Sequence, residues 1–129
     1  MKITAFNPVI TTNRPEAVLG VFEKFGFTKK HSPTFTGPDG YDVTDYVMET
    51  DTGFKMDIHA VDAPIEEEML LIRMNVDDFD EAYKMLTDLG FKPAHSSGKV
   101  TETDYAKGVA MASPIGFNIY LIQHKKKEH

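Results

Sequence analysis

The sequence predicts an α+β protein made of two βαβββ modules. First, the stretch FGFTKKH at 25–31 returns as LGFKPAH at 89–95, sixty-four positions later. Second, each of these stretches follows a strand-like and then a helix-like pattern. Third, each half closes on a matching strand, GFKMDIHA at 53–60 and GFNIYLIQ at 116–123. A fold unit that occurs twice in one chain explains all three observations.

The first module, 1–62, opens with the apolar stretch ITAFNPVIT, which is typical of a strand. A helix follows, because Asn13 and Glu16 form a capping pair at its start and Gly26 supplies a stop. Strand-like segments separated by TGPDG and DTG complete the module. The apolar face of the expected helix repeats at helical spacing and contains Val18, Phe22 and Phe25.

The second module, 68–124, repeats this order. MLLIRMNV reads as a strand, Asp78 and Glu81 form the capping pair of a helix, and Gly90 supplies its stop. SSGK and SPIG mark turns between the strands that follow. The apolar face of this helix contains Phe79, Ala82, Leu86 and Leu89.

Alternation along the strands sorts their side chains onto two faces. The apolar faces should pack on the helices and contain Phe54, Met56 and Ile58 in the first module and Leu70, Ile72, Met74, Val76, Phe117, Ile119 and Leu121 in the second. The opposite faces are mixed and carry Lys55, Asp57, His59, Leu71, Arg73, Asn75, Asn118, Tyr120 and Ile122. Polar groups on a sheet face indicate either solvent or a polar cavity.

The composition excludes several classes of function. Lysine and arginine number 14 against 20 acidic residues, and the net charge of −6 argues against a nucleic-acid partner. The absence of cysteine removes disulfides, thiol nucleophiles and cysteine zinc sites. No apolar run approaches the ~20 residues of a membrane span, and no signal peptide is evident. We expect a cytoplasmic protein with a single domain, 1–129, and no membrane partner.

Three segments carry a family resemblance: NRPEAVLGVFEKFGF, VDDFDEAYKMLTDLGF and SPIGFNIYLI. With the order of the elements, they resemble the vicinal oxygen chelate superfamily, which includes glyoxalase I, extradiol dioxygenases, fosfomycin-resistance enzymes and bleomycin-binding resistance proteins. The resemblance covers essentially the whole chain. It implies paired βαβββ units that share one mixed sheet, cupped around one cavity, with the helices on the outer face, in a homodimer.

The metal enzymes of this superfamily take ligands from the first and last strands of each unit. By the resemblance, these positions fall at Asn7 (or Phe6), Asp57, Leu71 and Tyr120. Only Asp57 is a ready ligand, because an amide oxygen is weak, leucine has no donor atom and a phenol holds its proton. A catalytic divalent ion typically needs about three protein ligands. At the positions that the resemblance gives for the family's site, we therefore expect no cofactor. A divalent metal is the alternative.

Two pairs of residues could belong either to a functional site or to the scaffold. His59 follows Asp57 by two residues, so both should point to one face about 7 Å apart along the strand. They could ligate a metal, act as a catalytic acid–base pair, or form an ion pair near solvent at a strand end. The repeated histidines, His31 and His95, follow the helix stops, and we expect them at the surface as part of the scaffold.

Arg73 stands beside Asn75 on the mixed face. It could bind a carboxylate or phosphate of a ligand through paired hydrogen bonds, or it could neutralise Asp57. Aromatic residues and methionines could line an adaptable pocket or belong to the core: Tyr41, Tyr46, Met48, Tyr105, Met111 and Tyr120. The candidate ligand-binding set is Asn7, Tyr46, Lys55, Asp57, His59, Arg73, Asn75, Asn118 and Tyr120.

These patterns favour a small-molecule-binding protein that resembles the bleomycin-resistance branch. Binding needs a pre-formed pocket and a few polar groups but no metal, and the acidic balance suits a cationic or aromatic ligand. The alternative is a metal-dependent glyoxalase-like lyase or isomerase with Asp57 and His59 as catalytic residues. A ligand-sensing module that acts through its dimer surface is a third class, for which the sequence offers no specific sign.

Overall fold

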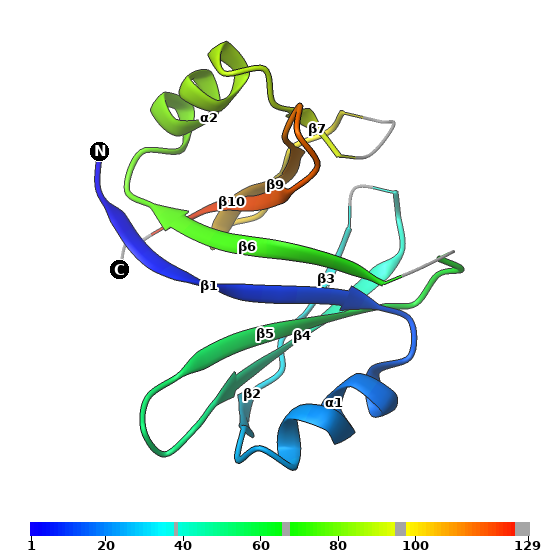
Figure 1. Ribbon diagram of the computed structural model, residues 1–129. Helices are drawn as coiled ribbons and strands as arrows, with labels where there is room; N and C mark the ends of the chain where they lie inside the picture. Colours follow the sequence, from blue (N-terminus) through cyan, green and yellow to red (C-terminus); the bar gives the residue numbers. More distant parts are fainter. Residues whose placement is uncertain (38, 66–67, 95–97, 126–129) are drawn as a thin grey trace. The chain divides into compact units, whose positions relative to one another are not determined.

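In the residues that it describes, the computed structural model of the chain contains ten strands and two helices, which confirms the α+β class. Figure 1 shows their arrangement. The residues that the structure describes are 1–37, 39–65, 68–94 and 98–125. The chain divides into two compact units. The first unit is Asn7–Leu70, and the second unit combines Met1–Phe6 with Leu71–His129. The first six residues therefore group with the second half of the chain, which the sequence pattern does not indicate.

The first unit contains a mixed sheet with the strand order β2-β4-β5-β1, and β3 also pairs with β4. β4 and β5 are antiparallel, whereas β1 runs parallel to β5 with Val9 opposite Asp57. The elements are β1 (Ile3–Thr12), which enters this unit at residue 7, α1 (Pro15–Glu23), β2 (Thr28–His31), β3 (Thr34–Thr36), β4 (Asp42–Glu49) and β5 (Lys55–Val61).

The second unit repeats this plan with the strand order β6-β10-β9-β7, and β8 also pairs with β9. β10 is antiparallel to β9 and parallel to β6, with Tyr120 opposite Arg73. The elements are β6 (Met69–Val76), α2 (Phe79–Asp88), β7 (Lys92–Pro93), β8 (Thr101–Glu102), β9 (Ala106–Ala112) and β10 (Asn118–His124). In the described residues no helix is both long and apolar enough to cross a membrane.

The repeated Gly-Phe pair ends both helices in the same way. Gly26 and Gly90 have φ of 97° and 95°, a left-handed conformation that glycine adopts without steric cost. The amide of Phe27 donates to the carbonyl of Phe22, and the amide of Phe91 donates to the carbonyl of Leu86. This is the Schellman ending of a helix, in which the residue after glycine turns back towards the core. The sequence repeat is therefore a repeat of helix ends.

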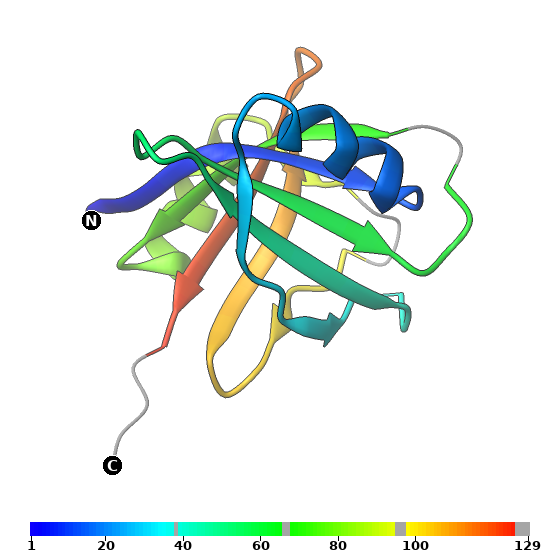
Figure 2. The ribbon, with the colours of Figure 1, turned by 90° about the horizontal axis from the view of Figure 1, so that it is seen from below.

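The core of the first unit lies between α1 and one face of its sheet, as Figure 2 shows from below. Leu19 of α1 packs against Met48, Met56 and Ile58 of the hairpin β4–β5. The expected orientation of Met56 and Ile58 is confirmed. Phe54 is instead 69% exposed, because β5 begins only at Lys55 and Phe54 lies in the preceding turn.

The core of the second unit is formed by α2 and the corresponding face of its sheet. It contains Val76, Phe79, Ala82, Leu86, Phe91, Val109, Met111 and Leu121, with Met74 and Ile119 partly buried beside them. Met48 and Met111 are fully buried and thus belong to the cores. Phe25 and Leu89, expected on the helix faces, are exposed, and both lie beyond the last residue of their helix. Leu70 and Phe117, expected on apolar sheet faces, are also exposed.

The two helices begin differently. Asp78 caps α2 as expected, and its Oδ1 accepts a hydrogen bond from the amide of Glu81. Asn13 does not cap α1, because the N-cap position is Arg14 and no side chain caps it. Asn13 donates from Nδ2 to the carbonyl of Ala63 instead. The expectation of two equivalent capping pairs was therefore wrong for the first helix.

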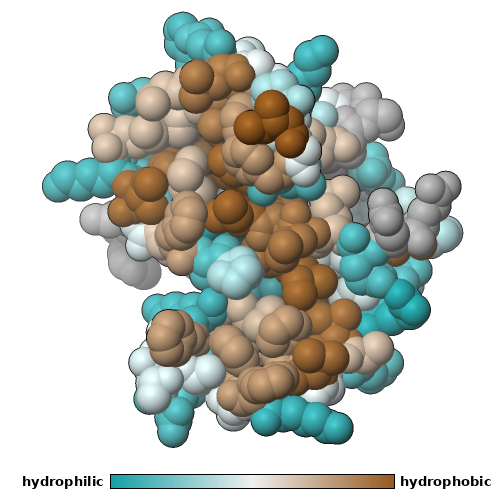
Figure 3. Space-filling model, in the orientation of Figure 1, coloured by the Kyte–Doolittle hydropathy of each residue, from teal (hydrophilic) through white to brown (hydrophobic). Residues whose placement is uncertain are grey.

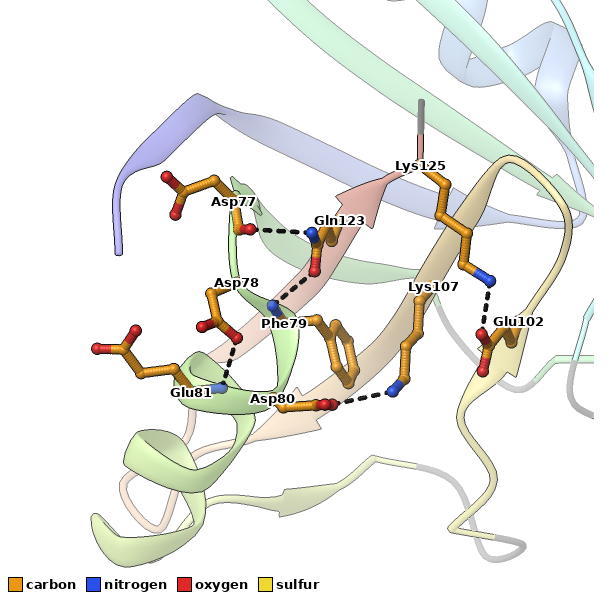
Figure 4. Close-up of polar contacts among 9 residues, drawn as sticks. All are labelled: Asp77, Asp78, Phe79, Asp80, Glu81, Glu102, Lys107, Gln123 and Lys125. Atoms are coloured by element: carbon orange, nitrogen blue, oxygen red, sulfur yellow. Dashed lines mark hydrogen bonds and ion pairs between the residues drawn. The ribbon is translucent and has the colours of Figure 1, made fainter. Parts of the chain in front are cut away.

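Gln123 of β10 fastens the start of α2 to the sheet (Figure 4). Its Oε1 accepts from the amide of Phe79 at 2.7 Å, and its Nε2 donates to the carbonyl of Asp77 at 2.9 Å. Lys107 of β9 lies over the Phe79 ring and donates to Asp80, whose carboxylate raises the pKa of Lys107. The side chain of Gln123 thus forms hydrogen bonds with two backbone groups at the junction between β6 and α2.

We expect Gln123→Ala to lower the free energy of unfolding by about 1–2 kcal/mol, because the Phe79 amide and the Asp77 carbonyl both lose their partner. Urea unfolding followed by circular dichroism measures this. The matched control is Asn13→Ala, which removes one exposed side-chain hydrogen bond and should change stability by less than about 0.5 kcal/mol. Equal effects of the two variants would contradict the role given to Gln123.

A pH titration should detect the exposed ion pair between Glu102 and Lys125. Lys125 donates to Glu102 at 2.5 Å, and this hydrogen bond holds the pKa of Glu102 below its ordinary value. The pair therefore stabilises the fold above the pKa of Glu102 in the unfolded chain, and this contribution disappears as the pH falls through the lowered value. In an NMR titration of the Glu102 carboxyl, Lys125→Met should raise its pKa. Lys84→Met, which removes the separate pair with Asp88, should leave it unchanged.

Candidate functional site

A cluster of ionisable side chains occupies the face of the first unit that α1 does not cover. Met56 and Ile58 face α1, so the intervening Asp57 and the following His59 point the other way. Asp45 of β4 is the direct cross-strand partner of His59 and shares this face. All three residues are buried, with exposed fractions of 7% for Asp45, 3% for Asp57 and 6% for His59. We call these three residues the Asp–His cluster.

The cluster is compact. His59 Nε2 lies 3.6 Å from Asp45 Oδ1, and one ligand atom from each of the three residues lies within 4.8 Å of the others. Asn7 of β1 donates from Nδ2 to Asp57 Oδ1 at 3.0 Å, and the edge of the Phe35 ring faces the His59 ring at 6.1 Å between centroids. The predicted residues Asn7, Asp57 and His59 are therefore brought together.

Asp45 is the residue that the sequence did not reveal. It precedes His59 by fourteen positions, and only the register of the hairpin β4–β5 places the two side chains opposite each other. A signal was present in the alternation of DVTDYVME, which separates Asp45 from the apolar Tyr46 and Met48. That local pattern does not indicate which residue of the neighbouring strand lies opposite Asp45.

Two other predicted residues of the first unit lie apart from the cluster. Tyr46 is next to Asp45 in the strand and therefore points to the opposite face, where it packs beside the α1 core with Lys29 Nζ over its ring. Period-two alternation thus separates Tyr46 from the cluster, and its role in ligand binding stays a prediction. Lys55 is the exposed first residue of β5 and pairs with Glu49.

In the second unit, Arg73 is held by protein side chains. Its Nε donates to Asn75 Oδ1 at 2.9 Å, and its Nη2 lies 3.1 Å from His124 Nε2. A guanidinium group only donates, so His124 Nε2 is the acceptor in this contact. Asn75 and His124 thus engage two of the nitrogen atoms of Arg73. Binding of a ligand by Arg73 stays a prediction.

Tyr120 lies on β10 opposite Arg73, with its ring over Gly108 of β9. A Cβ atom at Gly108 would lie 3.2 Å from both the ring and the hydroxyl oxygen of Tyr120, so the glycine makes room for the ring. Asn118, the first residue of β10, is half-buried and pairs with Ala112. Of the other aromatic candidates, Tyr41 and Tyr105 are exposed.

The second unit carries different residues at the positions of the Asp–His cluster. Asp45 and His59 form a cross-strand pair in the first unit, and Gly108 and Ile122 form the corresponding pair in the second. Tyr120 takes the place of Asp57, since each precedes the second member of its pair by two residues. The two halves therefore share a backbone plan but not a site.

The positions of the family's metal ligands do not fit a metal ion. Asn7 and Asp57 are in contact within the first unit. Leu71, at the corresponding position of β6, is a buried apolar residue, and Tyr120 offers only a phenol. Three of the four positions therefore supply no ready ligand, because the amide oxygen of Asn7 is also a weak donor.

The first histidine of the sequence repeat, His31, is not part of the cluster. His31 is an exposed residue of the edge strand β2, where it pairs with Val47. His95 lies outside the described residues, as does His129. The expected surface position thus holds for His31.

The chain has the fold of the glyoxalase/bleomycin resistance protein/dioxygenase superfamily, as the vicinal oxygen chelate resemblance implied. A superfamily member from Vibrio splendidus 12B01 matches 95% of this chain and 99% of its own, with a TM-score of 0.56 and 14% identity. Methylmalonyl-CoA epimerase from Mycobacterium tuberculosis matches 96% of this chain and 90% of its own (TM-score 0.67, 11% identity). A hypothetical protein from Bacillus halodurans C-125 matches 100% and 99% (TM-score 0.67, 12% identity).

At these identities the likeness concerns the fold alone. No family model matches the chain, and no curated protein matches it in sequence.

Proposed function

We propose that the chain is a small-molecule-binding protein of the glyoxalase/bleomycin-resistance-like class and that its ligand binds at the Asp–His cluster through a positively charged group. The observation that carries this proposal is the burial of Asp45, Asp57 and His59 side by side on the face of the sheet that α1 leaves uncovered. A face that served only to hold the fold together would be apolar, as the opposite face is.

Charge and shape both favour a cationic ligand. When the two carboxylates are ionised, they outnumber the single imidazole, so the charge of the cluster is negative whether His59 is protonated or neutral. A nearby cation stabilises buried carboxylates in their ionised form. Phe35 beside His59 adds an aromatic wall, which suits a ligand that combines a cation with an aromatic ring.

Phenyltrimethylammonium is a suitable probe, because it joins an aromatic ring to a permanent cation. We expect it to shift the amide NMR signals of Asp45, Asp57 and His59, and we expect Asp57→Asn to weaken its binding at least about tenfold, about 1.4 kcal/mol. The titration is followed in two-dimensional ¹H–¹⁵N spectra of the full chain.

Two controls isolate the charge. tert-Butylbenzene has the same shape without the charge, and it should cause no shifts at the cluster. Asp51→Asn removes an exposed carboxylate from the turn between β4 and β5 and should leave the affinity unchanged. Equal shifts by the cation and its neutral counterpart would show that charge does not guide binding and would contradict the proposal.

An enzyme is the second candidate, in the form of a metal-dependent lyase or isomerase of the glyoxalase-like class. The approach of His59 Nε2 to Asp45 Oδ1, with Asp57 beside them, favours it, because such a set can move a proton or hold an ion. Structures of this fold include methylmalonyl-CoA epimerases, and methylmalonyl-CoA is therefore a reasonable first substrate to test.

If this candidate is correct, the chain supplied with a divalent metal should exchange the C2 proton of methylmalonyl-CoA for solvent deuterium, which ¹H NMR detects. Asp57→Asn should abolish the exchange, and His31→Gln should not change it, since His31 is exposed on β2. Exchange that persists in Asp57→Asn would contradict a catalytic role for the cluster.

A second copy of the chain stays the predicted partner. Large apolar side chains are exposed at equivalent positions of the two halves: Phe6 and Leu70, Val21 and Met85, Phe25 and Leu89, Phe54 and Phe117. Exposed apolar residues in such numbers are typical of surfaces that pack against another protein. A cytoplasmic location likewise stays a prediction.

A further inference from the structure

We infer that the Asp–His cluster is a divalent metal site built entirely within the first unit, with Asp45, Asp57 and His59 as its ligands. This inference goes beyond the proposed function, since it assigns a metal ion to the same cluster. It does not depend on the binding of an organic cation, and the two can fail separately. The site differs from the family's pattern, which takes ligands from both halves of the chain.

The spacing of the donor atoms suits a small ion. In a tetrahedral site with bonds of about 2.1 Å, neighbouring ligand atoms lie about 3.4 Å apart. His59 Nε2 and Asp45 Oδ1 are already 3.6 Å apart, and all three ligand atoms lie within 4.8 Å of one another. The donor atoms therefore lie close to the spacing that such a site requires.

The backbone positions are well fixed for such a site. Asp45 and His59 are direct partners in the antiparallel pair β4–β5, and Asp57 is two residues from His59 on the same face. On the other side, Leu19 packs against Met56 and Ile58 and holds this part of β5 in place. A metal site on paired strands is more accurately pre-formed than one on loops.

Asn7 adds an orienting contact. Its amide donates to Asp57 Oδ1, and since a carboxylate has two oxygens, it can accept this bond and ligate an ion at once. Such contacts fix the direction of a metal-bound carboxylate and raise the affinity of the site. Asn7 therefore acts as a positioning residue rather than a ligand.

The donor set selects the kind of ion. One imidazole nitrogen with two carboxylates suits Zn²⁺, Co²⁺, Ni²⁺ or Mn²⁺, and three protein ligands leave a position open for water or a ligand. Ca²⁺ and Mg²⁺ prefer six or more oxygen ligands and should bind weakly. The corresponding residues of the second unit are Gly108, Tyr120 and Ile122, so we expect one ion per chain.

Calorimetric titration of the full chain with zinc chloride, after treatment with a chelator and its removal, tests the inference. We expect one ion per chain, and we expect Asp45→Asn and His59→Gln each to weaken binding at least about tenfold. Cobalt should give the strong visible absorption of a four-coordinate ion. The matched controls are Asp51→Asn and His31→Gln, which change the same residue types at exposed positions and should bind as the original chain does.

A second measurement on the unaltered chain covers the case in which a variant fails to fold. Substoichiometric Mn²⁺ should broaden the amide NMR signals of Asp45, Asp57 and His59 before those of His31 or His124. Broadening centred on the exposed histidines, the absence of zinc binding, or full affinity in both folded cluster variants would each overturn the inference. If phenyltrimethylammonium still shifts the amide signals of the cluster in that case, the result supports the proposed function and contradicts only the metal site.

Discussion

The register of the hairpin β4–β5 is the constraint on which the rest of the first unit depends. Because side chains alternate across a strand, one register sends Met48, Met56 and Ile58 towards α1 and the Asp–His cluster towards the other face. A slip by one residue would bury charges under the helix and expose the core. The apolar packing that stabilises the hairpin therefore also assembles the polar cluster. The same strand register determines both the stability of the first unit and the position of the cluster.

The two units show how one backbone plan carries two different polar faces. Both end their helix on a left-handed glycine followed by a phenylalanine, and both pair an opening strand in parallel with a closing one. Yet the first unit places carboxylates and an imidazole together, whereas the second places Arg73 with Asn75 and His124. Backbone geometry depends on the core and on turns, so the opposite face is free to differ in chemistry.

The fold by itself says little about activity. Solved structures that match nearly the whole chain share 11% to 14% of its residues, and at that distance only the architecture is common. Leu71 and Tyr120 stand at two positions where the resemblance predicts the family's metal ligands, and Asp45 joins Asp57 and His59 elsewhere. The chemistry of the cluster, rather than the fold, is therefore the basis for the functional proposals.

The sequence by itself determined the repeat, the helix ends at Gly26 and Gly90, and the face on which Asp57 and His59 lie. These features depend on neighbours in the chain, where glycine conformation and period-two alternation act. Only the tertiary structure decided that Asp45 meets His59, that Tyr46 lies on the other face from this pair, and that Arg73 contacts His124. Those contacts depend on strand register and on residues distant in sequence, which no local pattern encodes.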